Sequence, residues 1–113
     1  MAKDEKQSSL PENMTQELRR GVIILAVLSQ LNEEEYGYSL MGKLTEQGME
    51  IDQGTLYPLL RRLESKGLLQ SDWRVEGSRP RRYYKISPLG TEILPLLIKE
   101  WNRLTEVMKG LLQ

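Results

Sequence analysis

The chain contains no cysteine, no histidine and no phenylalanine. Without cysteine and histidine it has no disulfide, no thiolate nucleophile, no zinc site of the usual kind and no imidazole general base. It also lacks a glycine-rich phosphate loop and a pair of carboxylates at a catalytic spacing. The three glutamates at positions 33–35 fit a solvated loop better than a metal site. We therefore expect no enzyme, no metal and no cofactor.

A long apolar run is also absent. The longest one, residues 21–28, falls far below the roughly 18 residues that would suggest a membrane span. No basic and apolar leader with a small-residue cleavage site begins the chain. These features predict a cytoplasmic protein.

Net charge is the third absence, because 16 basic residues balance 16 acidic ones. The balance conceals an uneven distribution along the chain. Residues 1–52 carry five basic and ten acidic side chains, a net −5, while residues 53–85 carry eight basic and three acidic ones, a net +5. Residues 86–113 have three of each sign. A local positive excess of this size is typical of a surface that binds a polyanion.

The 113 residues are enough for one domain with a modest core and a helical extension. Residues 1–11 are polar and predict a flexible tail. Residues 12–31 have helical periodicity, capped by Asn13 or Thr15, and are apolar nearly all round from Val22 to Leu28. Such a helix needs cover on several sides, and a second subunit is one source of that cover.

Two further helices are predicted at residues 36–48 and 53–66. Gly48 suits a left-handed C-cap and Asp52 an N-cap. Two short helices with a tight connection form a helix-turn-helix. The second of them has an inner face of leucines at positions 56, 59, 60 and 63, and an outer face with small residues first and arginines later.

Residues 68–75 and 81–87 are β-prone and predict a hairpin with a five-residue loop, residues 76–80. Ser87-Pro88 then predicts the start of a last helix that ends near Leu112, with a kink at Pro95. Its near-heptad apolar stripe consists of Ile93, Leu97, Trp101, Leu104, Met108 and Leu111. The fold class is mainly α (α+β), a winged helix-turn-helix with a two-stranded wing.

The motifs YGYSL (36–40), GTLYPLLRRLESKGLL (54–69), SDW (71–73), SRPRRYYKIS (78–87) and Gly90 appear in this order. Together they resemble the PadR family of bacterial winged-helix transcriptional regulators, over residues 30–94. The single helix after the wing is similar to the family's smaller subgroup of dimeric DNA-binding repressors. Ser78 departs from the glycine that this family often has before Arg-Pro. The resemblance implies a DNA-binding domain at residues 12–87 and a dimerisation helix at residues 88–113.

The third helix is expected to enter the major groove of double-stranded DNA, and the wing tip to reach the flanking backbone or minor groove. The candidate DNA contacts are Tyr36, Tyr38, Gln53, Thr55, Tyr57, Arg61, Arg79, Arg81 and Arg82. For Tyr36, Tyr57 and Tyr84, packing and DNA contact remain open alternatives, because aromatic rings must supply much of the core in a domain without phenylalanine. Tyr83 and Tyr84 point to opposite sides of a strand, so at least one of them is structural.

A homodimer is expected to form through the first and last helices. The candidate interface residues are Val22, Leu25, Ile93, Leu97, Trp101, Leu104, Met108 and Leu111. Such a two-fold dimer would present two recognition helices about 34 Å apart to an inverted-repeat operator. Trp101 is either a core anchor of this interface or, as the resemblance implies, the wall of a cavity for a small planar hydrophobic effector. Trp73 is expected to pack structurally.

The main rival hypothesis is a winged-helix module that binds another protein and no DNA. The two differ in a simple observable, because DNA affinity falls steeply with salt when arginines neutralise phosphates.

Overall fold

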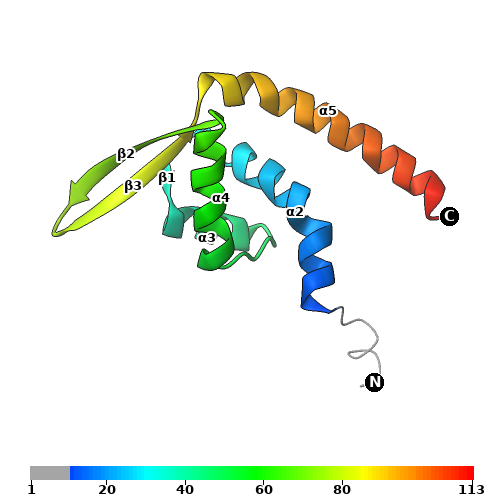
Figure 1. Cartoon of the computed structure of the whole chain (residues 1–113), viewed down its shortest axis with the longest axis horizontal. Coiled ribbons are helices and arrows are strands. Elements are labelled where there is room, and N and C mark those ends of the chain that lie inside the picture. Colours follow the sequence, from blue (N-terminus) through cyan, green and yellow to red (C-terminus); the bar gives the residue numbers. More distant parts are fainter. Residues whose placement is uncertain (1–10) are drawn as a thin grey trace.

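The computed structural model describes residues 11–113 (Figure 1). The predicted tail lies outside the described residues, except for Pro11. The elements in chain order are α2 (Glu12–Ser29), β1 (Glu35–Tyr36), α3 (Gly37–Glu46), α4 (Gln53–Ser65), β2 (Leu69–Glu76), β3 (Arg79–Ile86) and α5 (Pro88–Leu111). The order is that of a winged helix-turn-helix with one helix after the wing, so the predicted mainly α (α+β) class is confirmed.

Helix α2 begins after Pro11, which occupies the N-cap position without a side-chain hydrogen bond. The predicted caps Asn13 and Thr15 are therefore wrong, because both residues already lie inside the first turn. Ile23, Val27 and Leu28 are buried on one side of the helix. The apolar character of residues 22–28 thus reflects a central helix whose second half enters the core.

The predicted helix-turn-helix consists of α3 and α4. Glycines with positive φ end both helices, Gly48 at 97° and Gly67 at 84°, as a left-handed C-terminal cap requires. Asp52 is the N-cap residue of α4, but its side chain accepts no capping hydrogen bond. The buried face of α4 is the predicted one, formed by Leu56, Leu59, Leu60 and Leu63.

The sheet has three strands in the order β1-β3-β2, all antiparallel, so the predicted two-stranded wing gains a short third strand. Residues 35 and 36, expected at the end of a loop and at a helix start, pair with Tyr84 and Tyr83. The hairpin turn is also tighter than predicted. Strand pairing extends to Glu76 and Arg79, which leaves two turn residues, and Gly77 has a φ of 62°. A glycine with positive φ at the first turn position is typical of a type II′ turn.

Helix α5 is anchored at the base of the hairpin. The Ser87 hydroxyl accepts a hydrogen bond from the Gly90 amide at 2.9 Å and donates one to the Gly67 carbonyl at 2.6 Å, which confirms the predicted cap. Gly90 lies so close to Leu68 that an added Cβ would be 2.3 Å from its carbonyl oxygen. The helix continues through Pro95 to Leu111.

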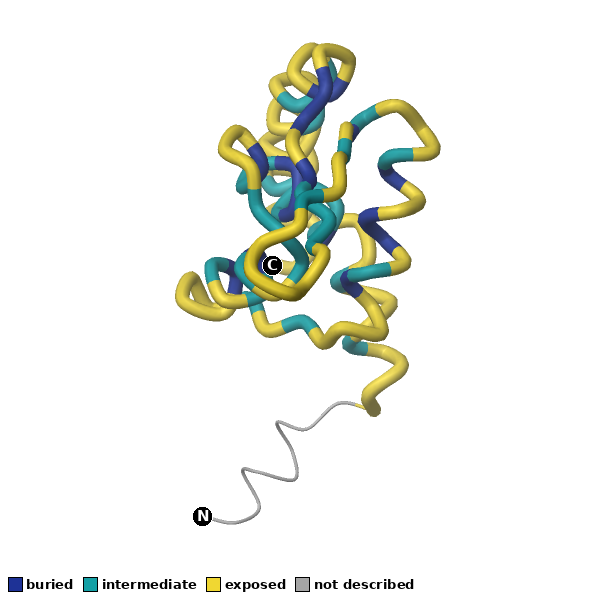
Figure 2. The backbone as a smooth tube through the Cα atoms, turned by 90° about the vertical axis from the view of Figure 1, so that its left-hand side faces the viewer, coloured by how far each residue is buried: buried dark blue, intermediate teal, exposed yellow. Residues whose placement is uncertain are grey.

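The core collects buried side chains from α2, α3, α4 and the base of the hairpin. Figure 2 shows the buried segments in the body of the molecule, whereas the last turns of α5 are exposed. In Figure 1 the hairpin and α5 extend in opposite directions from this body. No helix within residues 11–113 combines the length and the apolar content needed to cross a bilayer.

Candidate nucleic-acid interface

An open groove of about 590 Å³ lies between α4 and the hairpin. Its walls come from the β1–α3 junction, the outer face of α4 and both strands of the wing. The lining residues are Tyr36, Gly37, Tyr38, Gln53, Tyr57, Leu60, Arg61, Trp73, Arg79, Pro80, Arg81, Arg82 and Tyr84. We call this the wing groove. It brings together eight of the nine predicted DNA contacts from four separate stretches of the sequence.

The ninth, Thr55, lies elsewhere. It is exposed on the opposite side of α4, where it lines a second open groove of about 840 Å³ between α4 and α2. Arg62 and Arg19 line that groove as well, together with the carboxylates of Glu50 and Asp52. The outer ridge of α4 therefore separates a mixed-charge groove from the wing groove.

The wing groove contains no carboxylate among its lining residues, although it has four arginines. Two of these, Arg61 and Arg79, have no ion-pair partner within residues 11–113. Both are exposed. An exposed, unpaired guanidinium can bind a phosphate without first breaking an internal contact.

Arg81 is half-exposed and already engaged. Its guanidinium carbon lies 4.4 Å from the centroid of the Tyr36 ring, and its Nη1 lies 3.3 Å from the Glu76 carboxylate. The Tyr83 hydroxyl donates a hydrogen bond of 2.8 Å to the same carboxylate, and this bond raises the pKa of Tyr83. The ring of Tyr83 meets that of Tyr36 edge to face at 5.4 Å. These contacts hold Arg81 against the sheet but leave its edge open to the groove.

Arg82 is held more firmly. Its Nη2 forms an ion pair of 2.9 Å with Glu64 of α4, and its Nε donates to the Ser71 hydroxyl at 3.0 Å. Ser71 donates to Glu64 in turn at 2.7 Å. This triangle ties the wing to α4, so Arg82 has a structural role in the free protein whether or not it also contacts a phosphate.

Tyr57 packs against the start of α3. A Cβ on Gly37 would lie 2.4 Å from Cε1 of its ring, so the ring touches the backbone at this position. Tyr57 is half-buried, lines the wing groove and also contacts the core. Packing and an accessible position in the groove are thus combined in one residue. Tyr84 is buried, with 6% of its surface exposed, which confirms a structural role for one of the paired tyrosines at 83 and 84.

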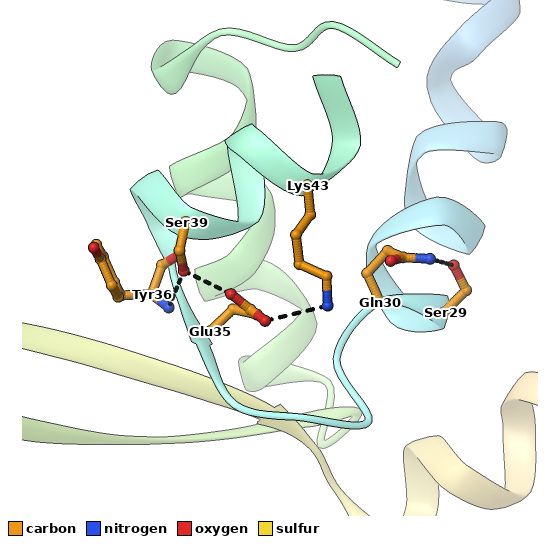
Figure 3. Close-up of polar contacts among 6 residues, drawn as sticks. All are labelled: Ser29, Gln30, Glu35, Tyr36, Ser39 and Lys43. Atoms are coloured by element: carbon orange, nitrogen blue, oxygen red, sulfur yellow. Dashed lines mark hydrogen bonds and ion pairs between the residues drawn. The ribbon is translucent and has the colours of Figure 1, made fainter. Parts of the chain in front are cut away.

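The β1–α3 junction fixes the edge of the groove (Figure 3). The Ser39 hydroxyl accepts a hydrogen bond from the Tyr36 amide at 3.1 Å and donates one to Glu35 at 2.7 Å. Glu35 also forms an ion pair of 3.2 Å with Lys43. Glu34 pairs with Arg74 of the wing. The expectation of a solvated acidic loop is therefore wrong for these two glutamates, because tertiary contacts that periodicity does not report engage both.

Two aromatic residues do not occupy the positions expected of them. Trp73 is 63% exposed on the wing, so the expectation of structural packing within the chain is wrong. Tyr38 is 68% exposed on the first turn of α3, beside the groove. Trp73 is a groove residue that was not among the predicted contacts, although its position two residues after Ser71 places it on the face toward α4.

The predicted dimer residues fall into two groups. Val22, Leu25, Ile93 and Leu97 are half-buried, and Leu97 packs against the core of its own chain. The remaining four, Trp101, Leu104, Met108 and Leu111, are exposed on α5. Leu18 of α2 is 76% exposed. Within residues 11–113 no cluster of three acidic side chains is arranged to hold a metal ion.

The fold and the basic groove define the class of protein. A helix-turn-helix whose second helix has an exposed outer face, closed by an arginine-bearing wing, is the architecture of winged-helix transcriptional regulators. A family model for the PadR-like transcriptional regulators matches residues 24–95. The chain belongs to the PadR-like family of transcriptional regulators.

Individual relatives agree with this assignment. The transcriptional regulator Rv3488 of Mycobacterium tuberculosis is 39% identical over 79 residues, which cover 69% of this chain and 74% of that protein. A PadR-family regulator from Eggerthella lenta is similar in structure with a TM-score of 0.85 and 44% identity, over 100% of this chain and 97% of the other. A PadR-like transcription factor from Bacteroides fragilis has a TM-score of 0.74 and 32% identity, over 88% and 98% of the two chains.

Proposed function

We propose that this protein is a sequence-specific DNA-binding repressor that binds an inverted-repeat operator as a homodimer. Residues 12–87 form the DNA-binding unit and residues 88–113 the dimerisation helix. The wing groove is the observation that supports the proposal most, because four arginines and no carboxylate line it beside the exposed face of α4. The proposed function is exercised on chromosomal DNA, in the cytoplasm.

In this proposal α4 enters the major groove. Gln53 and Arg61 lie on the side of α4 that faces the wing groove, and both side chain types bond base edges or phosphates. Arg79, next to the hairpin turn, reaches the flanking backbone or the minor groove. Thr55 contacts DNA only if the duplex also covers the α2 side of the α4 ridge.

Arginine substitutions test the DNA-binding part. Arg61→Ala and Arg81→Ala each weaken binding to genomic fragments selected by the wild-type protein, measured by fluorescence anisotropy. Lys109→Ala, in the last turn of α5, removes the same charge far from the groove and leaves the affinity unchanged. Unaltered binding by both arginine variants contradicts the placement. A wild-type protein without salt-dependent affinity for any fragment favours the rival protein-binding module.

The uncovered apolar faces of α2 and α5 support the homodimer. Trp101 and Leu104 of α5 are 44% and 43% exposed, although a soluble monomer rarely leaves a long apolar stripe uncovered. A second copy would cover them, and a two-fold interface would orient two α4 helices toward successive major grooves.

A pair of matched variants tests this interface. Leu104→Glu adds one negative charge to the stripe and is expected to give a monomer in sedimentation. Lys99→Gln lowers the charge by the same amount on the opposite side of α5 and leaves a dimer. A wild-type protein that sediments as a monomer at micromolar concentration contradicts the proposal.

The effector is the last part of the proposal. Trp101 is exposed in the single chain, and its copies from two subunits can face each other across the axis and enclose a site for planar hydrophobic compounds. Such a compound would be expected to quench Trp101 fluorescence in a Trp73→Phe background and to release the operator fragment. Quenching that persists after Trp101→Ala contradicts this site.

A further inference from the structure

The wing has an apolar face that its own chain leaves uncovered. Trp73 and Val75 of β2 are 63% and 75% exposed. Val75 is paired directly with Pro80 of β3, which is also exposed. Alternate residues on a strand point to the same side, and directly paired residues do as well. The three side chains therefore form one patch, which we call the wing patch.

The wing patch continues the buried face of the same hairpin. Leu69 and Tyr84, on this side at the base of the wing, are buried against the body. Helix α4 covers that base, but the hairpin extends beyond it (Figure 1). The apolar pattern thus persists where no element of the chain within residues 11–113 covers it.

A second copy of the chain is a poor candidate for covering the wing patch. The uncovered stripe of α5 lies on an arm that extends away from the body on the other side from the hairpin (Figure 1). A dimer formed through α5 and α2 would leave the wing patch exposed.

The charge around the patch identifies a better occupant. Trp73 and Pro80 line the wing groove together with four arginines and no carboxylate. The Arg82 guanidinium carbon lies 5.6 Å from the centroid of the Trp73 ring. An apolar surface enclosed by cations of one sign matches a ligand with apolar faces between regularly spaced anions. Duplex DNA has this chemistry, because its deoxyribose rings alternate with phosphates along each strand.

We propose that Trp73, with Val75 and Pro80, packs against the deoxyribose rings and base edges of a duplex bound in the wing groove. This inference rests on the proposed DNA-binding function. It adds an apolar contact that releases no counterions, since only charge neutralisation of phosphates does so. Trp73→Ala then weakens DNA binding by about tenfold, a loss typical of one aromatic contact with nucleic acid, without changing the salt slope. Arg79→Ala lowers both the affinity and the slope.

The direct test is fluorine NMR on the whole protein labelled with 5-fluorotryptophan. The chain has two tryptophans, so two resonances are expected, and Trp73→Phe assigns them. The probe is a mixed-sequence duplex of about three helical turns (~30 bp) at low salt, and anisotropy of the labelled duplex monitors binding independently. On binding, the Trp73 resonance shifts and the Trp101 resonance, on the α5 arm, serves as the internal comparison.

The outcomes separate the two proposals. Binding with a shifted Trp73 resonance and an affinity loss in Trp73→Ala supports the contact. Binding with an unmoved Trp73 resonance and an unaltered affinity in Trp73→Ala overturns the contact and leaves the DNA-binding function intact. No binding of this duplex or of any genomic fragment overturns both.

Discussion

The close approach of Gly37 to Tyr57 leads to a quantitative prediction for Gly37→Ala. A Cβ at this position would lie 2.4 Å from Cε1 and 2.6 Å from Cζ of the Tyr57 ring. Carbon atoms in contact normally lie about 3.5–4.0 Å apart, so the ring must move by about 1 Å. The obstacle is a half-buried side chain on the groove wall, which moves more readily than a backbone.

Two terms decide the size of the effect. Overpacking of this kind costs about 1–3 kcal/mol, and the open groove favours the lower half of that range. Alanine is better than glycine in a helix by up to about 1 kcal/mol, which acts in the other direction. We expect Gly37→Ala to destabilise the wild type slightly and to become neutral or stabilising in a Tyr57→Ala background. The resulting coupling energy is about 1–2 kcal/mol.

Chemical denaturation of the four proteins of this double-mutant cycle, at one fixed protein concentration, measures the coupling. Gly42→Ala is the matched control, since it lies on the same helix and a Cβ there has no neighbour within 4 Å. It is expected to stabilise the protein in both backgrounds. An equal free-energy change for Gly37→Ala with and without Tyr57 would refute the reasoning. DNA affinity should also fall in Gly37→Ala, because the displaced ring belongs to the groove.

Two further predictions concern the wing and its junction with α5. In Gly90→Ala the new Cβ meets a main-chain carbonyl oxygen at 2.3 Å, which cannot rotate away, so denaturation should reveal a loss of about 3 kcal/mol or more, whereas Gly110→Ala, with no neighbour within 4 Å, is not destabilising. Glu76→Gln removes the carboxylate that engages Arg81 and should tighten DNA binding in an anisotropy titration, more than the same charge change in Glu106→Gln; equal effects of the two variants contradict a competition between Glu76 and phosphate.

Much of the fold could be predicted from local signals. The four leucines of α4 repeat at the helical period, and the structure buries all of them. Gly48, Gly67 and Ser87 end or begin helices where their conformational freedom or capping oxygen is needed. These features depend on a few neighbouring residues, so the sequence alone specifies them.

Other features depend on contacts between distant residues. Strand β1 has two residues, too few for any periodicity, and exists because Tyr36 and Glu35 lie beside β3. Pro80 argued against a strand, yet it lies in the part of β3 that has only β2 as a neighbour, where a missing donor is tolerated. The exposure of Trp73 was also beyond prediction. Alternation gives the side of the hairpin to which it points, but not how far α4 covers that side.

The candidate site was predictable in its residue types more than in its connections. Eight of the nine predicted contacts meet in one groove because the helix, the β1–α3 junction and the wing converge there. The ion pair of Arg82 with Glu64 and the stacking of Arg81 on Tyr36 join residues that are 18 and 45 positions apart. No local pattern distinguishes these held arginines from the unpaired Arg61 and Arg79.

The salt dependence of DNA affinity tests the central claim most directly. Arg61 and Arg79 supply two unpaired cations per protomer, so four phosphates are neutralised by a dimer and the slope of log K against log salt is about −4 or steeper. Removing one of these arginines should reduce the slope by about 2 in the dimer, since each substitution occurs twice. Anisotropy titrations of the wild type and of Arg61→Ala over a salt series give both values. A flat dependence, or equal slopes for the two proteins, would contradict DNA binding through the wing groove.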